Sequence, residues 1–149
     1  MHRFQFSIIG LIATLGLILT GCGQNSNQAA QQTLFKAESY LHQGQLNAAA
    51  IEARNALQSQ STSQQANGLL AEIAWIMGDF KNAYKYYKQT NTLKFIPNQA
   101  LALTRLKKFD DAQSLLEKYE DQLNDSNAFH QAQGELFFAM GQYDISKAA

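Results

Sequence analysis

Apolar residues recur at every third or fourth position from Leu34 onward, which is the period of a helix with one buried face. Gly44, Gly78 and Gly141 each follow such an apolar segment, and we expect each to end a helix because glycine is common just after helix ends. The interval from Gly44 to Gly78 equals the interval from Lys107 to Gly141. The pattern predicts an all-α chain built from a repeated helix-turn-helix unit.

The residue types around these four turn points repeat as well. A small residue stands seven positions before each turn: Ala37, Ala71, Ala100 and Gly134. The residue four positions before the turn is large in most repeats: Tyr40, Ala74, Leu103 and Phe137. A large residue stands two positions after each turn: Leu46, Phe80, Phe109 and Tyr143. A small residue stands five positions after it: Ala49, Ala83, Ala112 and Ser146. This order resembles the tetratricopeptide (TPR) family, and the two equal intervals match that family's period of about 34 residues. The resemblance implies a TPR-like solenoid of about three and a half repeats.

The repeats depart from a regular array in their third unit. We place the repeat domain at 29–149, with repeats near 30–62, 63–96, 97–126 and 127–149, the last of them incomplete. The interval from Gly78 to Lys107 is shorter than the other two, which predicts a shortened helix over 98–106 with Pro97 in its first turn. Lys107 stands where the other turns have glycine, so we expect the third turn to be less tight.

The fourth repeat is expected to lack most of its second helix. That helix would begin near Tyr143, and about two turns follow before Ala149. A solenoid needs a polar capping helix over its last apolar face. Two interpretations stay open: the sequence is part of a longer array, or the last face is covered by a partner or by self-association.

The segment 1–21 has the features of a lipoprotein signal peptide. Ile8 to Leu19 forms a continuous apolar run behind Arg3, which fits a signal-peptide core and is too short to span a membrane. The residues Leu19-Thr20-Gly21-Cys22 resemble a bacterial lipobox. The resemblance implies cleavage before Cys22 and fatty acylation of that cysteine. The polar residues that follow, rich in Gly, Asn and Ser, predict a flexible tether over 22–28. Since Gly23 is not aspartate, the family's sorting rule implies the periplasmic face of the outer membrane.

Composition argues against several classes of function. The sequence has 12 basic and 12 acidic residues, and loss of Arg3 with the signal peptide leaves a net charge of −1, so we expect no nucleic-acid partner. After residue 22 the chain has no cysteine for a disulfide, and it offers only His42 and His130 as candidate histidine ligands. We therefore expect no catalytic residues, no metal site and no cofactor.

One helix face provides a candidate binding groove. The TPR resemblance implies that the first helix of each repeat lines a concave surface for a protein or an extended peptide. Glutamates at one position and large apolar residues at another would form two stripes there: Glu38, Glu72 and Glu135, beside Leu41, Trp75 and Phe138. Such a groove suits a ligand with basic and apolar groups. The alternative is that the glutamates are solvated helix formers and that Trp75 packs against the next repeat.

A further resemblance concerns the pathway. The segment 44–58, with its Asn-Ala-Leu-Gln ending, resembles the first repeat of PEP-CTERM system TPR lipoproteins, which implies a scaffold in exopolysaccharide production or protein sorting. Two other functions stay open. One is an adaptor of type IV pilus or outer-membrane barrel assembly. The other is a carbohydrate- or cell-wall-binding module, because Tyr84, Tyr86 and Tyr87 cluster with Lys81, Lys85 and Lys88.

Overall fold

The prediction of an all-α protein is confirmed by a computed structural model of the chain. It describes the backbone of residues 21–59 and 64–148, and the side chains of 28–58 and 64–142. Within these ranges the chain forms seven α-helices and one short 3-10 helix: α1 (Gly21–His42), α2 (Leu46–Ser59), α3 (Gln64–Ile76), α4 (Phe80–Gln89), η1 (Leu93–Phe95), α5 (Ile96–Arg105), α6 (Phe109–Leu123) and α7 (Asn127–Ala148).

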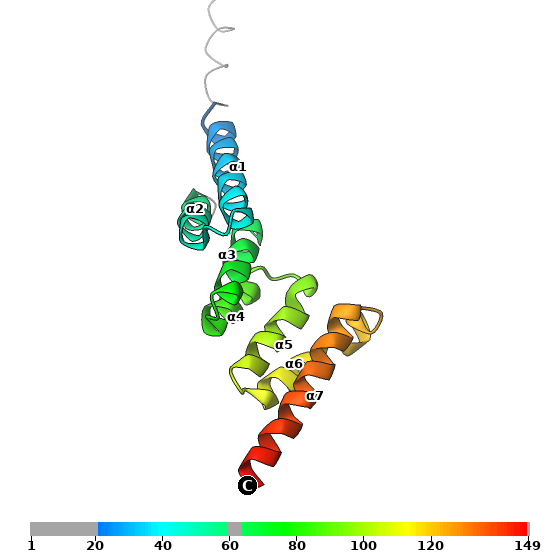
Figure 1. Ribbon diagram of the computed structural model, residues 1–149. Coiled ribbons are helices and arrows are strands. Elements are labelled where there is room, and N and C mark those ends of the chain that lie inside the picture. Colours follow the sequence, from blue (N-terminus) through cyan, green and yellow to red (C-terminus); the bar gives the residue numbers. More distant parts are fainter. Residues whose placement is uncertain (1–20, 60–63, 149) are drawn as a thin grey trace, which may run out of the picture.

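Successive helices pack in pairs. Helix α1 packs against α2, α3 against α4, and α5 against α6, while α7 packs against both α5 and α6. The pairs follow one another along an elongated array, with α1 at one end and α7 at the other (Figure 1). This arrangement is consistent with a helical repeat, and it gives the molecule a series of small hydrophobic clusters in place of one large core.

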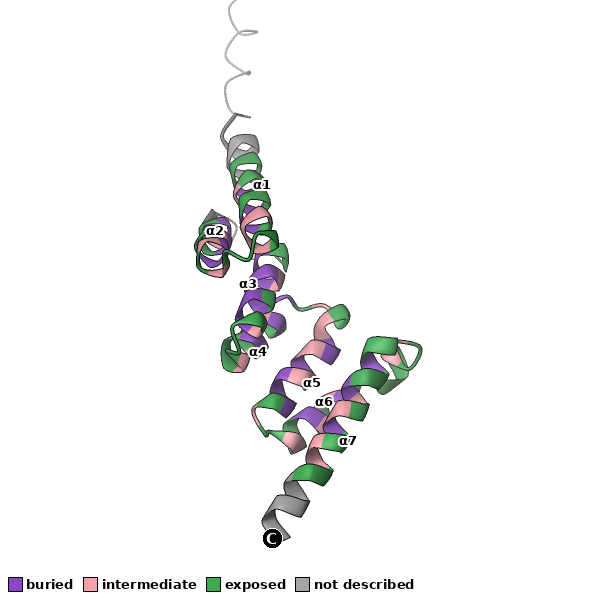
Figure 2. Ribbon diagram, in the orientation of Figure 1, coloured by how far each residue is buried: buried purple, intermediate pink, exposed green. Residues whose placement is uncertain are grey.

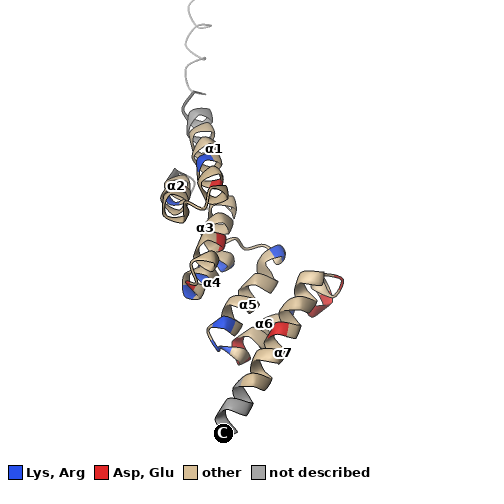
Figure 3. Cartoon of the chain, in the orientation of Figure 1, with Lys and Arg blue, Asp and Glu red and all other residues tan. Residues whose placement is uncertain are grey.

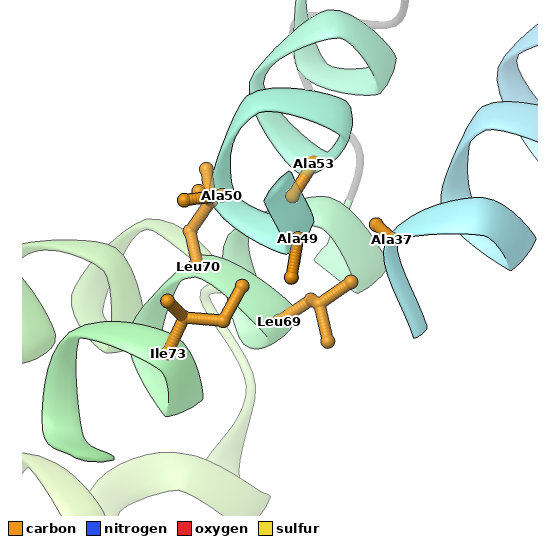
Figure 4. Packing of buried hydrophobic residues seen from close by; sticks show 7 residues of the cluster. All are labelled: Ala37, Ala49, Ala50, Ala53, Leu69, Leu70 and Ile73. Atoms are coloured by element: carbon orange, nitrogen blue, oxygen red, sulfur yellow. The ribbon is translucent and has the colours of Figure 1, made fainter. Parts of the chain in front are cut away.

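Small residues allow the paired helices to approach closely. The predicted alanines Ala37, Ala71 and Ala100 on the first helices are fully buried, and so are Ala49, Ala83 and Ala112 on the second helices. Around α1, α2 and α3 the cluster consists mainly of alanine methyl groups with three larger aliphatic side chains (Figure 4). Buried residues follow the inward faces of the pairs (Figure 2). The periodicity therefore predicted these buried positions correctly.

The three turns within the pairs share one geometry. Gly44, Gly78 and Lys107 have positive φ angles of 73°, 75° and 58°. In each turn this residue donates its N–H to the carbonyl three positions back, and the next residue donates to the carbonyl five positions back, at 2.8–3.0 Å. These bonds form the Schellman pattern that ends a helix. The expectation of a looser third turn is wrong, because Lys107 adopts the left-handed conformation and its turn keeps the same hydrogen bonds.

The link between the second and third pairs contains η1. Phe95 places its ring against α3 at Gly68, where an added Cβ would lie 3.3 Å from the ring. Pro97 lies in the first turn of α5, as predicted. Backbone N–H groups in a first turn have no partner within the helix, so proline loses no helical hydrogen bond there. Helix α5 begins at Ile96, slightly earlier than predicted, because η1 leads directly into it.

The predicted turn at Gly141 is wrong, because α7 continues through this residue to Ala148. Gly134 holds the register position of the buried Ala37, Ala71 and Ala100, yet it is exposed and an added Cβ there would meet nothing within 4 Å. Phe137, expected to pack in the fourth pair, is 62% exposed. The physical reason is shared. Because Gly134 and Phe137 are exposed, no packing on this face offsets the backbone hydrogen bonds that a turn at Gly141 would break, and the helix keeps these bonds by continuing.

The predictions for the N-terminal region stay untested. The signal peptide, the lipidated Cys22 and the tether over 22–28 fall almost wholly outside the residues whose side chains the structure describes, as do Tyr143 and Ser146. Of the helices in the described ranges, none is long and apolar enough to cross a membrane.

Candidate functional site

A surface hollow of about 640 Å³ lies along the first helices of successive pairs. Its walls come from α1, α3, the end of α4, η1 and the start of α5. We call it the α3 groove, and it is lined by Glu38, Gln64, Gln65, Gly68, Leu69, Glu72, Trp75, Tyr87, Thr92, Lys94, Phe95 and Asn98. Its volume lies within the range of ligand-binding clefts in proteins.

Aromatic side chains form one wall of the α3 groove. Trp75 is half-buried and packs edge-on against Phe80 of α4, with ring centroids 5.1 Å apart. Phe95 packs against Tyr87, with ring centroids 5.4 Å apart. The absence of a side chain at Gly68 lets Phe95 lie close to the backbone of α3. The wall is therefore held by contacts from α3, α4 and η1 together.

Charged groups lie at the rim of this wall. Glu38 and Glu72 are exposed, and the Lys94 ammonium lies 5.5 Å from the centroid of the Phe95 ring. Burial raises the pKa of the Tyr87 hydroxyl, and the negative charge of Glu72 raises it further, while a hydrogen bond with Asn98 acts in the opposite direction. Tyr87 therefore stays a neutral phenol, and the acidic side chains that line the groove are the exposed Glu38 and Glu72.

A second hollow, of about 520 Å³, lies beside the turn between α5 and α6. It is lined by Arg105, Lys107, Phe109, Glu135, Phe138, Ala139 and Gln142. Arg105 of the second hollow also lies near Trp75 of the α3 groove. Its guanidinium carbon lies 6.0 Å from the Trp75 ring centroid, and its Nη2 donates to Glu135 Oε2 at 2.8 Å. The basic end of α5 thus lies against the acidic position of α7 (Figure 3).

The structure distributes the predicted stripe over these two hollows. Glu38, Glu72 and Trp75 line the α3 groove, and Glu135 and Phe138 line the second hollow. Leu41 instead packs half-buried against the cluster of α1, α2 and α3. The sequence interpretation missed Phe95, Lys94 and Arg105. The first two belong to a segment outside the repeat pattern. Nothing in the repeat marked Arg105, because the positions two residues before the other turns hold His42, Ile76 and Ala139.

The remaining candidate residues have simpler roles. In the tyrosine and lysine cluster of α4, Tyr87 is buried in the core, and Lys81, Lys85 and Lys88 are exposed. The candidate ligands His42 and His130 are exposed, and His130 Nε2 lies 2.6 Å from the carbonyl oxygen of Asn124. In the part of the chain that the structure describes, no three His, Cys, Asp or Glu side chains are grouped closely enough to hold a metal ion.

The chain was also compared with known proteins. No protein-family model matches it, and no curated protein sequence matches it. The class that the structure defines is therefore an all-α protein with helices in sequential pairs. Any finer assignment depends on the sequence resemblances and on the two hollows.

Proposed function

We propose that this chain is a TPR-like scaffold that binds an extended segment of a partner protein in the α3 groove. The observation that carries the proposal is that side chains from successive helix pairs line one continuous hollow with an aromatic wall and two exposed glutamates. Aromatic residues are favoured anchors at protein interfaces. The exposed Glu38 and Glu72 favour a partner segment with basic and apolar side chains.

The scaffold acts, in this proposal, at a membrane surface of the bacterial envelope. Lipidation at Cys22 would hold the repeats at the periplasmic face of the outer membrane, since two or more acyl chains give stable anchoring. Tethering raises the effective concentration of a bound partner near that surface. The resemblance of 44–58 to PEP-CTERM system lipoproteins supports exopolysaccharide production or protein sorting as the pathway.

Photo-crosslinking in living cells tests the groove. We would place benzoylphenylalanine at Gln65, which lines the groove, and at Ile51 of α2 as an exposed control outside it. The expected result is a discrete adduct from position 65 that is absent from position 51. Trp75→Ala should weaken binding of the purified partner by roughly 30-fold, the loss typical of an aromatic hot spot. Equal adducts from both positions would refute the groove as the binding site.

A deletion strain tests the pathway and the anchor separately. Polysaccharide secretion, surface pili and outer-membrane barrel proteins would be measured in the same cultures, with the wild-type gene and a Cys22→Ala gene as rescue copies. Loss of polysaccharide alone, restored only by the wild-type copy, is the expected result. Loss of pili or barrel proteins with normal polysaccharide would overturn the pathway and leave the scaffold proposal standing.

A further inference from the structure

Four residues of α7 form an uncovered apolar stripe. Gly134, Phe137, Phe138 and Gly141 are spaced at i, i+3, i+4 and i+7, so they lie on one face of the helix. Phe137 and Phe138 are 62% and 71% exposed, and an added Cβ at either glycine would meet nothing within 4 Å. We call these four residues the α7 stripe.

The equivalent face of the earlier first helices packs against a paired helix. Ala37, Ala71 and Ala100 hold the position of Gly134, and all three are fully buried. Trp75 holds the position of Phe138 and packs against Phe80 of the next helix. The register therefore identifies the α7 stripe as a helix-packing face, and within the described residues no helix covers it.

The stripe is self-complementary under a two-fold axis. Its order, Gly-x-x-Phe-Phe-x-x-Gly, reads the same in both directions. If two copies of α7 pack antiparallel about the midpoint between Phe137 and Phe138, Gly134 of one copy faces Gly141 of the other. The bare backbone at the glycines then makes room for the rings of the facing phenylalanines. A closed two-fold contact of this kind uses the same surface on both copies.

Charge does not oppose this arrangement. Between residues 128 and 142 the only Asp, Glu, Lys or Arg is Glu135. The two-fold operation places it opposite Met140 of the second copy, not opposite the second Glu135. Its carboxylate is already paired with Arg105 of its own chain at 2.8 Å. Antiparallel pairing therefore brings no two like charges face to face along the described part of the stripe.

We propose that a second copy of this chain binds the α7 stripe, giving an antiparallel α7–α7 homodimer. The exposed fractions of the two phenylalanines, taken with about 200 Å² per ring, correspond to about 270 Å² per copy and about 530 Å² for the pair. A standard protein interface buries about 1,200 Å² or more in total. The dimer is therefore weak, and it forms as the protein concentration rises.

Disulfide trapping tests the geometry. In the full chain carrying Cys22→Ala, which then has no native cysteine, Gly134→Cys and Gly141→Cys are introduced singly. In the antiparallel dimer the two positions face each other, whereas two copies of position 134 are offset by about 10 Å along the helix axis. Mixing the two variants should give a mixed disulfide on oxidation, and either variant alone should give little. A stronger disulfide from Gly134→Cys alone, or no mixed disulfide, would overturn the proposal.

Sedimentation velocity of the full chain carrying Cys22→Ala, from about 1 µM to about 1 mM, tests the affinity. Phe137→Ser should raise the dissociation constant by roughly 30-fold. This variant leaves both hollows intact because Phe137 lines neither of them. Phe35→Ser is the matched control, since Phe35 of α1 is 73% exposed and lies outside the stripe. A chain that is monomeric throughout this range, or equal effects of the two variants, would refute the dimer.

Discussion

Lys107 provides a direct test of the turn geometry, because it adopts a backbone conformation that costs a non-glycine residue free energy. Its φ of 58° lies in the left-handed region, where a Cβ costs about 1–2 kcal/mol. Glycine removes that cost, but it adds about 0.4–1 kcal/mol of chain entropy to the unfolded state. Lys107→Gly should therefore stabilise the protein by about 0.5–1 kcal/mol.

Urea unfolding followed by helical circular dichroism measures this change. With a denaturant slope of about 2 kcal/mol per molar urea, the midpoint should rise by about 0.4 M while the slope stays constant. Lys108→Gly is the matched control, because Lys108 has a φ of −92° and gains nothing from glycine. This control should be neutral or less stable than the wild type.

Alanine substitutions at the other two turns test the same reasoning in reverse. At Gly44 and Gly78 an added Cβ meets nothing within 4 Å, so Gly44→Ala and Gly78→Ala introduce backbone strain without a clash. Each should lower the free energy of unfolding by about 0.5–1 kcal/mol. If Lys107→Gly is not stabilising while these two substitutions are costly, the three turns are not equivalent and the argument fails.

Three further predictions concern packing and titration. Ala100→Leu should lower the free energy of unfolding by about 1–3 kcal/mol, because Ala100 is fully buried, whereas Ala128→Leu at an exposed site should have little effect in the same urea assay. The pKa of Asp79 is lowered mainly by its hydrogen bonds with Asn82, so the wild type should lose stability as the pH falls below about 4. The melting temperature of Asp79→Asn should fall less in acid than that of the wild type. An equal fall in the two proteins would contradict the role of this cap. Burial raises the pKa of Tyr87 above 10.0, so the stability that the neutral Tyr87 side chain contributes is complete below that pH and is lost as the pH rises above it. Tyr87→Phe should not show this alkaline fall in melting temperature. The same fall in both proteins would refute the argument.

The sequence was most informative where local geometry and packing require the same residue. Leu46, Phe80 and Phe109 begin α2, α4 and α6 at the predicted positions. The periodic alanines could be assigned to the core because a helix pair this close has room for a methyl group and little more. Lys107 was placed correctly as a turn residue by register alone, although its conformation could not be read from its residue type.

Gly141 shows why the same reasoning failed for α7. Glycine permits the left-handed conformation, but it does not impose it. At Gly44 and Gly78 the turn is stabilised by burial of Ala49 and Ala83 on the following helix. Just before Gly141, Phe137 and Phe138 are exposed, so no packing offsets the backbone hydrogen bonds that a turn would break, and the helix continues. A turn residue predicts a turn only when the next helix can pack.

The α3 groove depends on the departure from the repeat more than on the repeat itself. The shortened interval between Gly78 and Lys107 places η1 and α5 closer along the chain than a regular unit would, and Phe95 then lies on Gly68 and against Tyr87. The repeat register could place Glu72 and Trp75 on the groove-facing side of α3. It could not place η1, because this segment has no equivalent in the other repeats. Replacing Phe95 with alanine should remove part of the aromatic wall and weaken partner binding while the three turns within the pairs remain intact. The irregular segment, not the periodic one, would then determine which ligand the groove accepts.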